Sequence, residues 1–336
     1  MKIGFLMDDL RKINPVWETT ACLMHECNRR AHSVYFFEPH DLYIRKNKVV
    51  ARMRNISVAP DLDIETYWAA LLNCLDKEEL IFETVEDLDT LFLRKNPPLN
   101  YQTMEFLEPV SDKVFMINSI HAVLNCSSKT YILNFPDIIP ETHVSRDPVR
   151  LQRIIDEFGG DMVLKPLHGY GGHGVIKVSN RDQENLSSLV HFYVQSRLPY
   201  PDRTPVMVQE YLKSVRVDGD VRILLLNGEI IGAMGRKSLT GDFRTNVHVG
   251  GEAFRHEVTP AQIKICERIK ERLIKDGLYF VGIDVIRDKL VEINPVSPGG
   301  IVRINQFDNV KLESKVIDFI EEKVSESKYA LQISST

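Results

Sequence analysis

Residues 162–178, MVLKPLHGYGGHGVIKV, decide the fold of this chain. Two runs rich in apolar and β-branched residues flank four glycines that fall within the six positions 169–174. Apolar runs joined by glycines predict two antiparallel strands with a tight connection. Lys165 lies on the incoming strand, four residues before the first of these glycines. The stretch therefore predicts a hairpin with a glycine-rich tip and a lysine close to it.

The glycine segment also matches the pattern G-x-G-x-x-G, which joins a strand to a helix in dinucleotide-binding domains. Here Val175 and Ile176 follow, so we expect a second strand in place of the helix and reject a Rossmann oxidoreductase. Glycines allow positive φ and close approach of the backbone, so N–H groups of such a flap can bind phosphate oxygens, with Lys165 adding a cation. A simple flexible turn is the alternative. The GK[ST] sequence of a P-loop does not follow.

A second informative stretch is residues 284–294, DVIRDKLVEIN. If the hairpin turns about Asp288, Asp284 faces Glu292, and Asn294 shares the face of Glu292 because strand side chains alternate. The other face is apolar throughout, with Val281, Ile283, Val285, Val291 and Ile293. Two carboxylates about 5 Å apart repel by roughly 3 kcal/mol at an effective dielectric of 20, which a cation relieves. Three oxygen donors match Mg²⁺, with Mn²⁺ as a substitute. A surface hairpin with two solvated acids is the alternative.

The remaining chain predicts an α/β domain followed by a β-rich part. Strands are expected at 2–7, 33–38, 88–94 and 114–118, and a helix at 19–30. A helix is also expected to begin near 124–129, at a soft boundary near residue 122. Further helices are expected at 149–158, 260–276 and 312–323, and further strands at 206–211 and on both sides of Asn227-Gly228, a strong hairpin signal.

The composition excludes several classes of protein. The chain has 336 residues and a formal net charge of −5, so a protein held to a polyanion by bulk positive charge is not expected, and we predict no nucleic-acid partner. Five cysteines without a CxxC pair indicate reduced thiols and hence the cytoplasm. No apolar run approaches the roughly 20 residues of a membrane span, so no membrane partner is expected.

In these features the chain resembles the ATP-grasp ligases, and within them the bacterial type of glutathione synthetase. The matching segments follow in order: MDDLRKIN near the start, HDLYIRKNKVVARMR at 40–54, LFLRKNPPLN at 91–100, the lysine of NCSSKT, VLKPLHGYGG, VQEYL, DGDVRILLLNGE, GLYFVGIDVI and LVEINPVSP. The resemblance implies an N-terminal pre-ATP-grasp α/β domain (1–122) and a two-lobed α+β ATP-grasp fold. The central lobe (123–200) carries the glycine flap, and the C-terminal lobe (201–330) carries the Mg²⁺ site.

The resemblance also implies roles for individual residues. The nucleotide-binding set comprises Lys129, Lys165, Gly169, Tyr170, Gly171, Gly172, Gln209, Glu210, Tyr211, Leu212 and Asp220. In this set the two lysines bind phosphates and residues 209–212 meet the adenine. Asp284, Glu292 and Asn294 hold Mg²⁺. A homo-oligomer, a tetramer by family analogy, is expected.

The implied activity joins γ-glutamylcysteine to glycine with ATP, through an acylphosphate. Arg222 is the candidate for stabilising the tetrahedral intermediate, and Arg236 or Arg244 for binding the carboxylates of the peptide. His168 and His173 flank the glycine segment, where packing of the flap is the favoured role. The alternatives are a related amino-acid or peptide ligase with a different acceptor, and an ATP-binding regulatory protein without catalytic activity.

Overall fold

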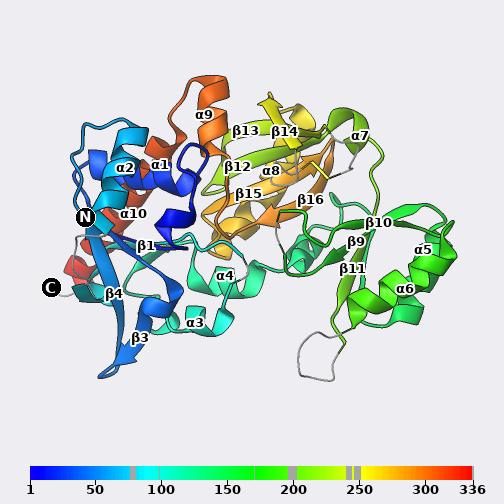
Figure 1. The fold of residues 1–336 in the computed structure, drawn as a ribbon, viewed down its shortest axis with the longest axis horizontal. Helices are drawn as coiled ribbons and strands as arrows, with labels where there is room; N and C mark the ends of the chain where they lie inside the picture. The colour runs from blue at the N-terminus through cyan, green and yellow to red at the C-terminus, as the bar shows by residue number, and fades with distance from the viewer. Residues whose placement is uncertain are drawn as a thin grey trace.

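The computed structural model describes residues 1–75, 81–97, 99–169, 171–195, 203–239, 244–245 and 251–334, with the backbone alone at 183–184 and 327–334. Tyr170 therefore lies outside the described residues. Three sheets follow one another across the molecule (Figure 1). The N-terminal sheet lies at one end, a small four-stranded sheet at the other, and a five-stranded sheet between them.

The N-terminal sheet has the order β3-β4-β2-β1-β6-β7, with β5 paired to β4. Its domain contains β1 (Lys2–Leu6), α1 (Thr19–Arg29), β2 (Ser33–Phe37), β3 (Leu42–Arg45), β4 (Lys48–Ile56), α2 (Ile64–Leu75), β5 (Ile81–Thr84), β6 (Thr90–Leu93), α3 (Tyr101–Glu105), β7 (Phe115–Ile117) and α4 (Ile120–Cys126). The strands β2, β1, β6 and β7 run parallel, as the strand–helix–strand opening predicted. The prediction that a helix begins near 124–129 is wrong, because α4 begins directly after Ser119.

Helices cover both faces of this sheet, which explains why its strands are continuous apolar runs. Ile3 and Phe5 of β1 pack with α1 and α2, whereas Leu6 packs with α3 and α4 on the opposite face. Phe5 stacks on Phe92 of β6, with ring centroids 4.8 Å apart. The last helix, α10 (Leu312–Ser334), returns to pack against α1, so the two ends of the chain share one core.

The small lobe is a four-stranded antiparallel sheet with the order β10-β9-β11-β8. It contains β8 (Thr142–Ser145), α5 (Pro148–Phe158), β9 (Asp161–Pro166), β10 (Ile176–Ser179), α6 (Gln183–Val194) and β11 (Val206–Glu210). The pairing of β9 with β10 confirms the predicted glycine-tipped hairpin. Because β11 pairs with β8 and β9, we move the proposed division between the lobes from residue 200 to the segment after Glu210.

The large lobe has the sheet order β14-β13-β12-β15-β16. It contains α7 (Val215–Asp218), β12 (Asp220–Leu226), β13 (Glu229–Ser238), β14 (Gly251–Arg255), α8 (Pro260–Lys275), β15 (Phe280–Ile286), β16 (Lys289–Asn294) and α9 (Ile301–Asp308). Asn227 and Gly228 have φ values of 49° and 77°, as a two-residue hairpin turn requires. The predicted helices at 149–158, 260–276 and 312–323 are confirmed in α5, α8 and α10.

The predicted register of the 284–294 hairpin is confirmed where it matters for chemistry. Asp284 lies opposite Glu292, and Gly282 lies opposite Asn294. A bulge after Asp284 then shifts the register, so that Val285 pairs with Leu290. The expectation that Val291 joins the apolar core is therefore wrong, because Leu290 is buried there instead and Val291 lines a pocket.

Among the described residues, no helix combines the length and the apolar composition needed to cross a membrane.

Candidate active site

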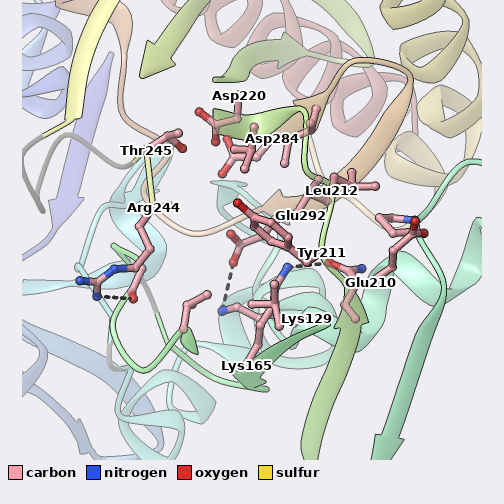
Figure 2. A pocket seen from close by; sticks show the side chains of 18 of the residues that line it. Lys129, Lys165, Glu210, Tyr211, Leu212, Asp220, Arg244, Thr245, Asp284 and Glu292 are labelled. Carbon is pink, nitrogen blue, oxygen red and sulfur yellow. Dashed lines mark hydrogen bonds and ion pairs between the residues drawn. The ribbon is translucent and has the colours of Figure 1, made fainter. Parts of the chain in front are cut away.

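A narrow pocket lies between the small and the large lobe (Figure 2). Its apolar wall comes from both lobes: Val163, Val175, Tyr211, Val215 and Ile286, which pack against one another. The segment 209–212 at the end of β11 lines the same pocket, as do Lys129 and Lys165. A flat apolar slot that ends in cationic groups suits an aromatic base that carries phosphates.

Lys165 is buried at the bottom of this pocket, on β9. Its Nζ donates to Oε1 of Gln209 on the neighbouring strand at 2.6 Å, and Nε2 of Gln209 donates to Oγ1 of Thr142 at 2.9 Å. Burial lowers the pKa of Lys165 from 10.5 to about 8. The ammonium group is thus desolvated and fixed in position, and it lacks a carboxylate partner within ion-pair distance among the described residues.

The glycine tip of the β9–β10 hairpin closes over the pocket from the small lobe. Gly171, Gly172 and Gly174 have φ values of 62°, 76° and 69°, so these positions use the conformation that glycine alone adopts without strain. Nη1 of Arg244 donates to the carbonyl oxygen of Gly172 at 3.3 Å, and Nζ of Lys129 donates to that of Gly169 at 2.9 Å. The tip is therefore held by the two cations that flank the pocket.

The predicted oxygen donors lie together at the inner end of the pocket, on β15 and β16. Asp284 and Glu292 face one another across the two strands, and Nδ2 of Asn294 donates to Oδ2 of Asp284 at 3.3 Å. Nζ of Lys129 lies 3.0 Å from Oε1 of Glu292. Among the described residues, no group of three or more His, Cys, Asp and Glu side chains is arranged to hold a metal ion, so a site here needs the amide of Asn294.

Two arginines hold Asp284 in place. Arg222 donates through Nε and Nη2 to the two oxygens of Asp284, at 2.6 and 3.0 Å, and Nη2 of Arg236 lies 2.8 Å from Oδ1. Arg236 is itself bound by Asp220, the residue opposite it on β12. Burial on its own would raise the pKa of Asp284, but the two guanidinium groups hold that pKa well below its usual range. The carboxylate is therefore ionised at neutral pH.

A larger cleft, with about 1840 Å³ of empty space open to solvent, adjoins the inner end of the narrow pocket. It is lined by Trp17, Glu18 and Thr19 of the N-terminal domain, and by the segment 293–300 with Arg303 of the large lobe. Lys129, Asp284 and Glu292 line both cavities. A group bound in the narrow pocket and a group bound in the cleft would thus meet at these three side chains.

Buried polar contacts fix the segment 295–300 to the N-terminal domain. The guanidinium of Arg94 donates to Oγ1 of Thr20 at 2.9 Å and to the carbonyl of Pro298 at 3.1 Å. Oγ1 of Thr19 accepts from the backbone N–H of Gly300 at 3.2 Å. Burial lowers the pKa of Arg94 to about 10. These contacts connect β6 and α1 to the start of α9, so they set the shape of the cleft.

The structure brings together nearly all of the site residues predicted from the sequence. Those that line the narrow pocket are Lys129, Lys165, Gly172, Gln209, Glu210, Tyr211, Leu212, Asp220, Arg244, Asp284 and Glu292. Those that line the larger cleft are Lys129, Gly169, Gly171, Arg222, Arg236, Asp284, Glu292 and Asn294. Tyr170 lies outside the described residues. His173 borders the narrow pocket, whereas His168 borders the cleft and its Nδ1 lies 3.3 Å from the hydroxyl of Tyr101.

Sequence reasoning missed several residues of the two cavities. Of the apolar residues that wall the narrow pocket it assigned only Tyr211 to the site, because single valines on strands carry no signal that separates a pocket wall from a core. It also missed Trp17, a residue that is 46% exposed, and the stacking of Arg303 on its ring. A tryptophan in a short polar loop before a helix is the one signal that could have drawn attention to this place.

Comparison with known proteins supports the arrangement over the whole chain. The family model for the prokaryotic glutathione synthetase N-terminal domain matches residues 1–123, and that for the prokaryotic glutathione synthetase ATP-grasp domain matches residues 128–309. A glutathione synthetase of Brucella melitensis is 35% identical over 96% of this chain and 98% of its own length. A glutathione synthetase of a Nostoc species is 34% identical over 96% of this chain and 99% of its own length.

Solved structures show the same fold at low identity. The crystal structure of a D-cycloserine synthetase covers 97% of this chain and all of its own, with a TM-score of 0.64 and 13% identity. A D-alanine–D-alanine ligase from Coxiella burnetii covers all of this chain and 99% of its own, with a TM-score of 0.59 and 13% identity. From its N-terminal sheet to the hairpin that carries Asp284, this chain belongs to the prokaryotic glutathione synthetase family and has the ATP-grasp fold.

Proposed function

We propose that this chain is an ATP-dependent ligase that joins γ-glutamylcysteine to glycine and forms glutathione, ADP and phosphate. One observation carries the proposal beyond family membership: the narrow pocket and the larger cleft share Lys129, Asp284 and Glu292. A nucleotide in the pocket can thus present its terminal phosphate to a carboxylate in the cleft.

The chemistry needs two steps, because a carboxylate is a poor electrophile. An oxygen of the cysteine carboxylate first attacks the γ-phosphorus, the bond to the β-phosphate oxygen breaks, and an acylphosphate and ADP form. The neutral amine of glycine then attacks the acyl carbon, a proton leaves the nitrogen, and phosphate departs. Closure of the glycine tip over the pocket would exclude water, which otherwise hydrolyses the acylphosphate.

Fixed cations are the contribution of this chain to the phosphoryl transfer. Lys165 is desolvated and held by Gln209, so it can bind a phosphate without losing a carboxylate partner. Lys129 reaches both the flap and Glu292, which places it beside the transferred group. Charges fixed before the substrate arrives need no reorganisation during the reaction, which is the main source of electrostatic catalysis.

The donor set at Asp284, Glu292 and Asn294 fits a divalent cation. Two carboxylates and an amide supply hard oxygen ligands, provided that the Asn294 side chain turns its oxygen toward Asp284, and so few protein ligands leave positions for water and phosphate, as Mg²⁺ prefers. When bound, Mg²⁺ or Mn²⁺ neutralises negative charge that develops on the phosphate oxygens. We propose these three residues as its ligands.

The arginines receive different roles in this proposal. Arg222 lines the cleft beside Asp284 and is our candidate for stabilising the tetrahedral intermediate. Arg236 is 4% exposed and bound to two carboxylates, so we propose that it positions Asp284 instead of binding the peptide. Arg244 borders the narrow pocket and the flap, and a contact with a substrate carboxylate stays a prediction for it.

The decisive experiment measures ADP and phosphate release with Mg-ATP, γ-glutamylcysteine and a panel of amines. We expect release that depends on both the donor and glycine, with alanine and serine as poor replacements. Faster release with another donor and amine pair would leave the ligase chemistry in place and remove the proposed product. Release without any amine would contradict ligation itself.

We further expect a cytoplasmic homo-oligomer, a tetramer by family analogy. Light scattering coupled to gel filtration measures the mass of this assembly.

A further inference from the structure

The larger cleft contains one cation that no carboxylate engages. Of its lysines and arginines, Lys129 is paired with Glu292, Arg222 with Asp284, and Arg236 with two aspartates. Arg303 has no ion-pair partner in the part of the chain that the structure describes. Its guanidinium carbon instead lies 4.3 Å from the ring centroid of Trp17. A half-buried arginine that is stacked but unpaired retains its capacity to bind an anion.

The position of Arg303 is determined by the contacts that fix α9. Arg303 lies in the first turn of this helix, whose preceding residue Gly300 donates its N–H to Thr19. Thr19 is two residues from Trp17, so the same short segment fixes the start of the helix and supplies the ring. Stacking on a rigid ring reduces the rotamer freedom that the guanidinium would lose on binding.

A carboxylate directly follows Trp17, the residue on which this cation stacks. Glu18 follows Trp17 in the chain and lines the same cleft. Its Oε1 accepts hydrogen bonds from the N–H and the hydroxyl of Thr20, at 3.3 and 3.1 Å. Nη2 of the buried Arg94 lies 3.7 Å from the same Oε1, whereas Oε2 has no hydrogen-bond partner among the described residues. An anionic oxygen and a guanidinium that line one cleft match the ammonium and the carboxylate of a zwitterionic amino-acid head group.

We propose that Trp17, Glu18 and Arg303 form the subsite for the γ-glutamyl head of the donor, a proposal that rests on the proposed function. Glu18 binds the α-ammonium group of this head, and Arg303 binds its α-carboxylate. Glycine also has both groups, but its amine must be free to attack the acylphosphate, which excludes a site that holds the ammonium. The head of the donor is also its end farthest from the reacting carboxylate. The three residues line only the larger cleft and none borders the nucleotide pocket, as this orientation requires.

The test compares three donors: γ-glutamylcysteine, 4-aminobutyrylcysteine, which lacks the α-carboxylate, and glutarylcysteine, which lacks the α-amino group. Arg303→Gln should raise the KM for γ-glutamylcysteine at least about tenfold, equivalent to about 1.4 kcal/mol. The same change should leave the KM for 4-aminobutyrylcysteine, ATP and glycine within about twofold, because that donor has no carboxylate to lose. Glu18→Gln should raise the KM for γ-glutamylcysteine and leave the KM for glutarylcysteine unchanged, because glutarylcysteine has no α-ammonium group to lose.

Matched variants separate recognition from folding. Arg255→Gln removes a guanidinium that pairs with Asp308 at the other end of α9, at 2.8 Å, and should change no KM. Trp17→Leu should raise the donor KM, whereas Trp17→Phe should restore most of the affinity because it retains a ring. If Arg303→Gln is poorly folded, Arg303→Met, which keeps an apolar stem beside Trp17 and removes the charge, provides the same comparison of donors.

The outcomes distinguish the two proposals. If the parent enzyme releases ADP with γ-glutamylcysteine and glycine, but Arg303→Gln weakens γ-glutamylcysteine and 4-aminobutyrylcysteine equally or neither, the subsite assignment is wrong and the proposed function stands. If the parent enzyme does not use γ-glutamylcysteine, the proposed function and the subsite both fail. A selective loss for the donor that carries the α-carboxylate supports the subsite.

Discussion

Lys165 should couple nucleotide binding to the uptake of a proton. Burial lowers the pKa of this side chain from 10.5 to about 8, which corresponds to about 3 kcal/mol against the charged form. A phosphate placed beside Nζ favours the charged form and raises the pKa again. Binding of ADP should therefore take up about 0.1 proton at pH 7, about 0.5 at pH 8 and about 0.9 at pH 9.

Isothermal titration calorimetry measures this uptake when the same ADP titration is repeated in buffers with different heats of ionisation. Phosphate groups of the nucleotide are fully ionised above pH 8, so they do not contribute there. Because protons are taken up on binding, the same measurement also predicts how the affinity for ADP depends on pH. Because binding requires the protonated lysine, the affinity should fall as pH rises above 8, approaching tenfold per pH unit.

Lys165→Met should bind ADP more weakly and should lose both the proton uptake and the fall in affinity between pH 8 and 9. Lys264→Met, on the exposed face of α8, is the matched control and should retain both. Proton uptake that is equal in the parent protein and in Lys165→Met would show that another group titrates. Absence of uptake in the parent protein at pH 8 to 9 would mean that Lys165 is fully charged before the nucleotide binds.

Four further predictions address the metal ligands, the flap and the backbone. Glu292→Gln should fold and lose at least about tenfold in kcat at saturating Mg²⁺, and turnover within twofold of the parent would exclude Glu292 from the site. Gly172→Val should raise the KM for ATP with little change in Tm, because φ at this residue is 76° and the residue lines the nucleotide pocket outside the hydrophobic cores; unchanged ATP kinetics would make it a simple turn. Gly219→Ala should lower the free energy of unfolding, measured by urea titration, by at least about 2 kcal/mol, because its Cβ would lie 2.1 Å from the carbonyl oxygen of Arg236. Gly159 also has a positive φ but no atom within 4 Å of an added Cβ, so Gly159→Ala should cost about 1 kcal/mol in the same titration. Mg²⁺ without nucleotide should leave Tm unchanged, whereas Mg-ADP should raise it, because the carboxylates around Asp284 are already balanced by Arg222, Arg236 and Lys129; an equal rise with Mg²⁺ alone would contradict this balance.

Local patterns were sufficient to predict the parts of the site that one hairpin contains. The facing of Asp284 and Glu292 follows from the alternation of strand side chains and a turn at known residues, and the structure confirms it. The glycine tip and Lys165 likewise belong to one hairpin. In both cases the residues that must meet are fewer than a dozen positions apart, so the turn alone determines which side chains face one another.

Contacts between distant segments could not be predicted in this way. The pairing of Arg222 with Asp284 requires β12 to lie beside β15, and no turn connects these strands. The stacking of Trp17 on Arg303 joins residues from the two ends of the chain. In each case the partner is chosen by tertiary packing, which a pattern within a short stretch does not contain.

The charges around Asp284 indicate in which form the proposed metal ion would enter. Asp220, Asp284 and Glu292 are balanced by Arg222, Arg236 and Lys129, so this network has no net charge before any ligand binds, and Lys165 adds one positive charge nearby. A free divalent cation would have to displace guanidinium groups from Asp284 and would meet four positive neighbours. A nucleotide brings phosphate oxygens, which provide new partners for those same cations and release the carboxylates. We therefore expect the proposed metal ion and the nucleotide to bind best as one complex, since each compensates the charge that the other leaves unpaired.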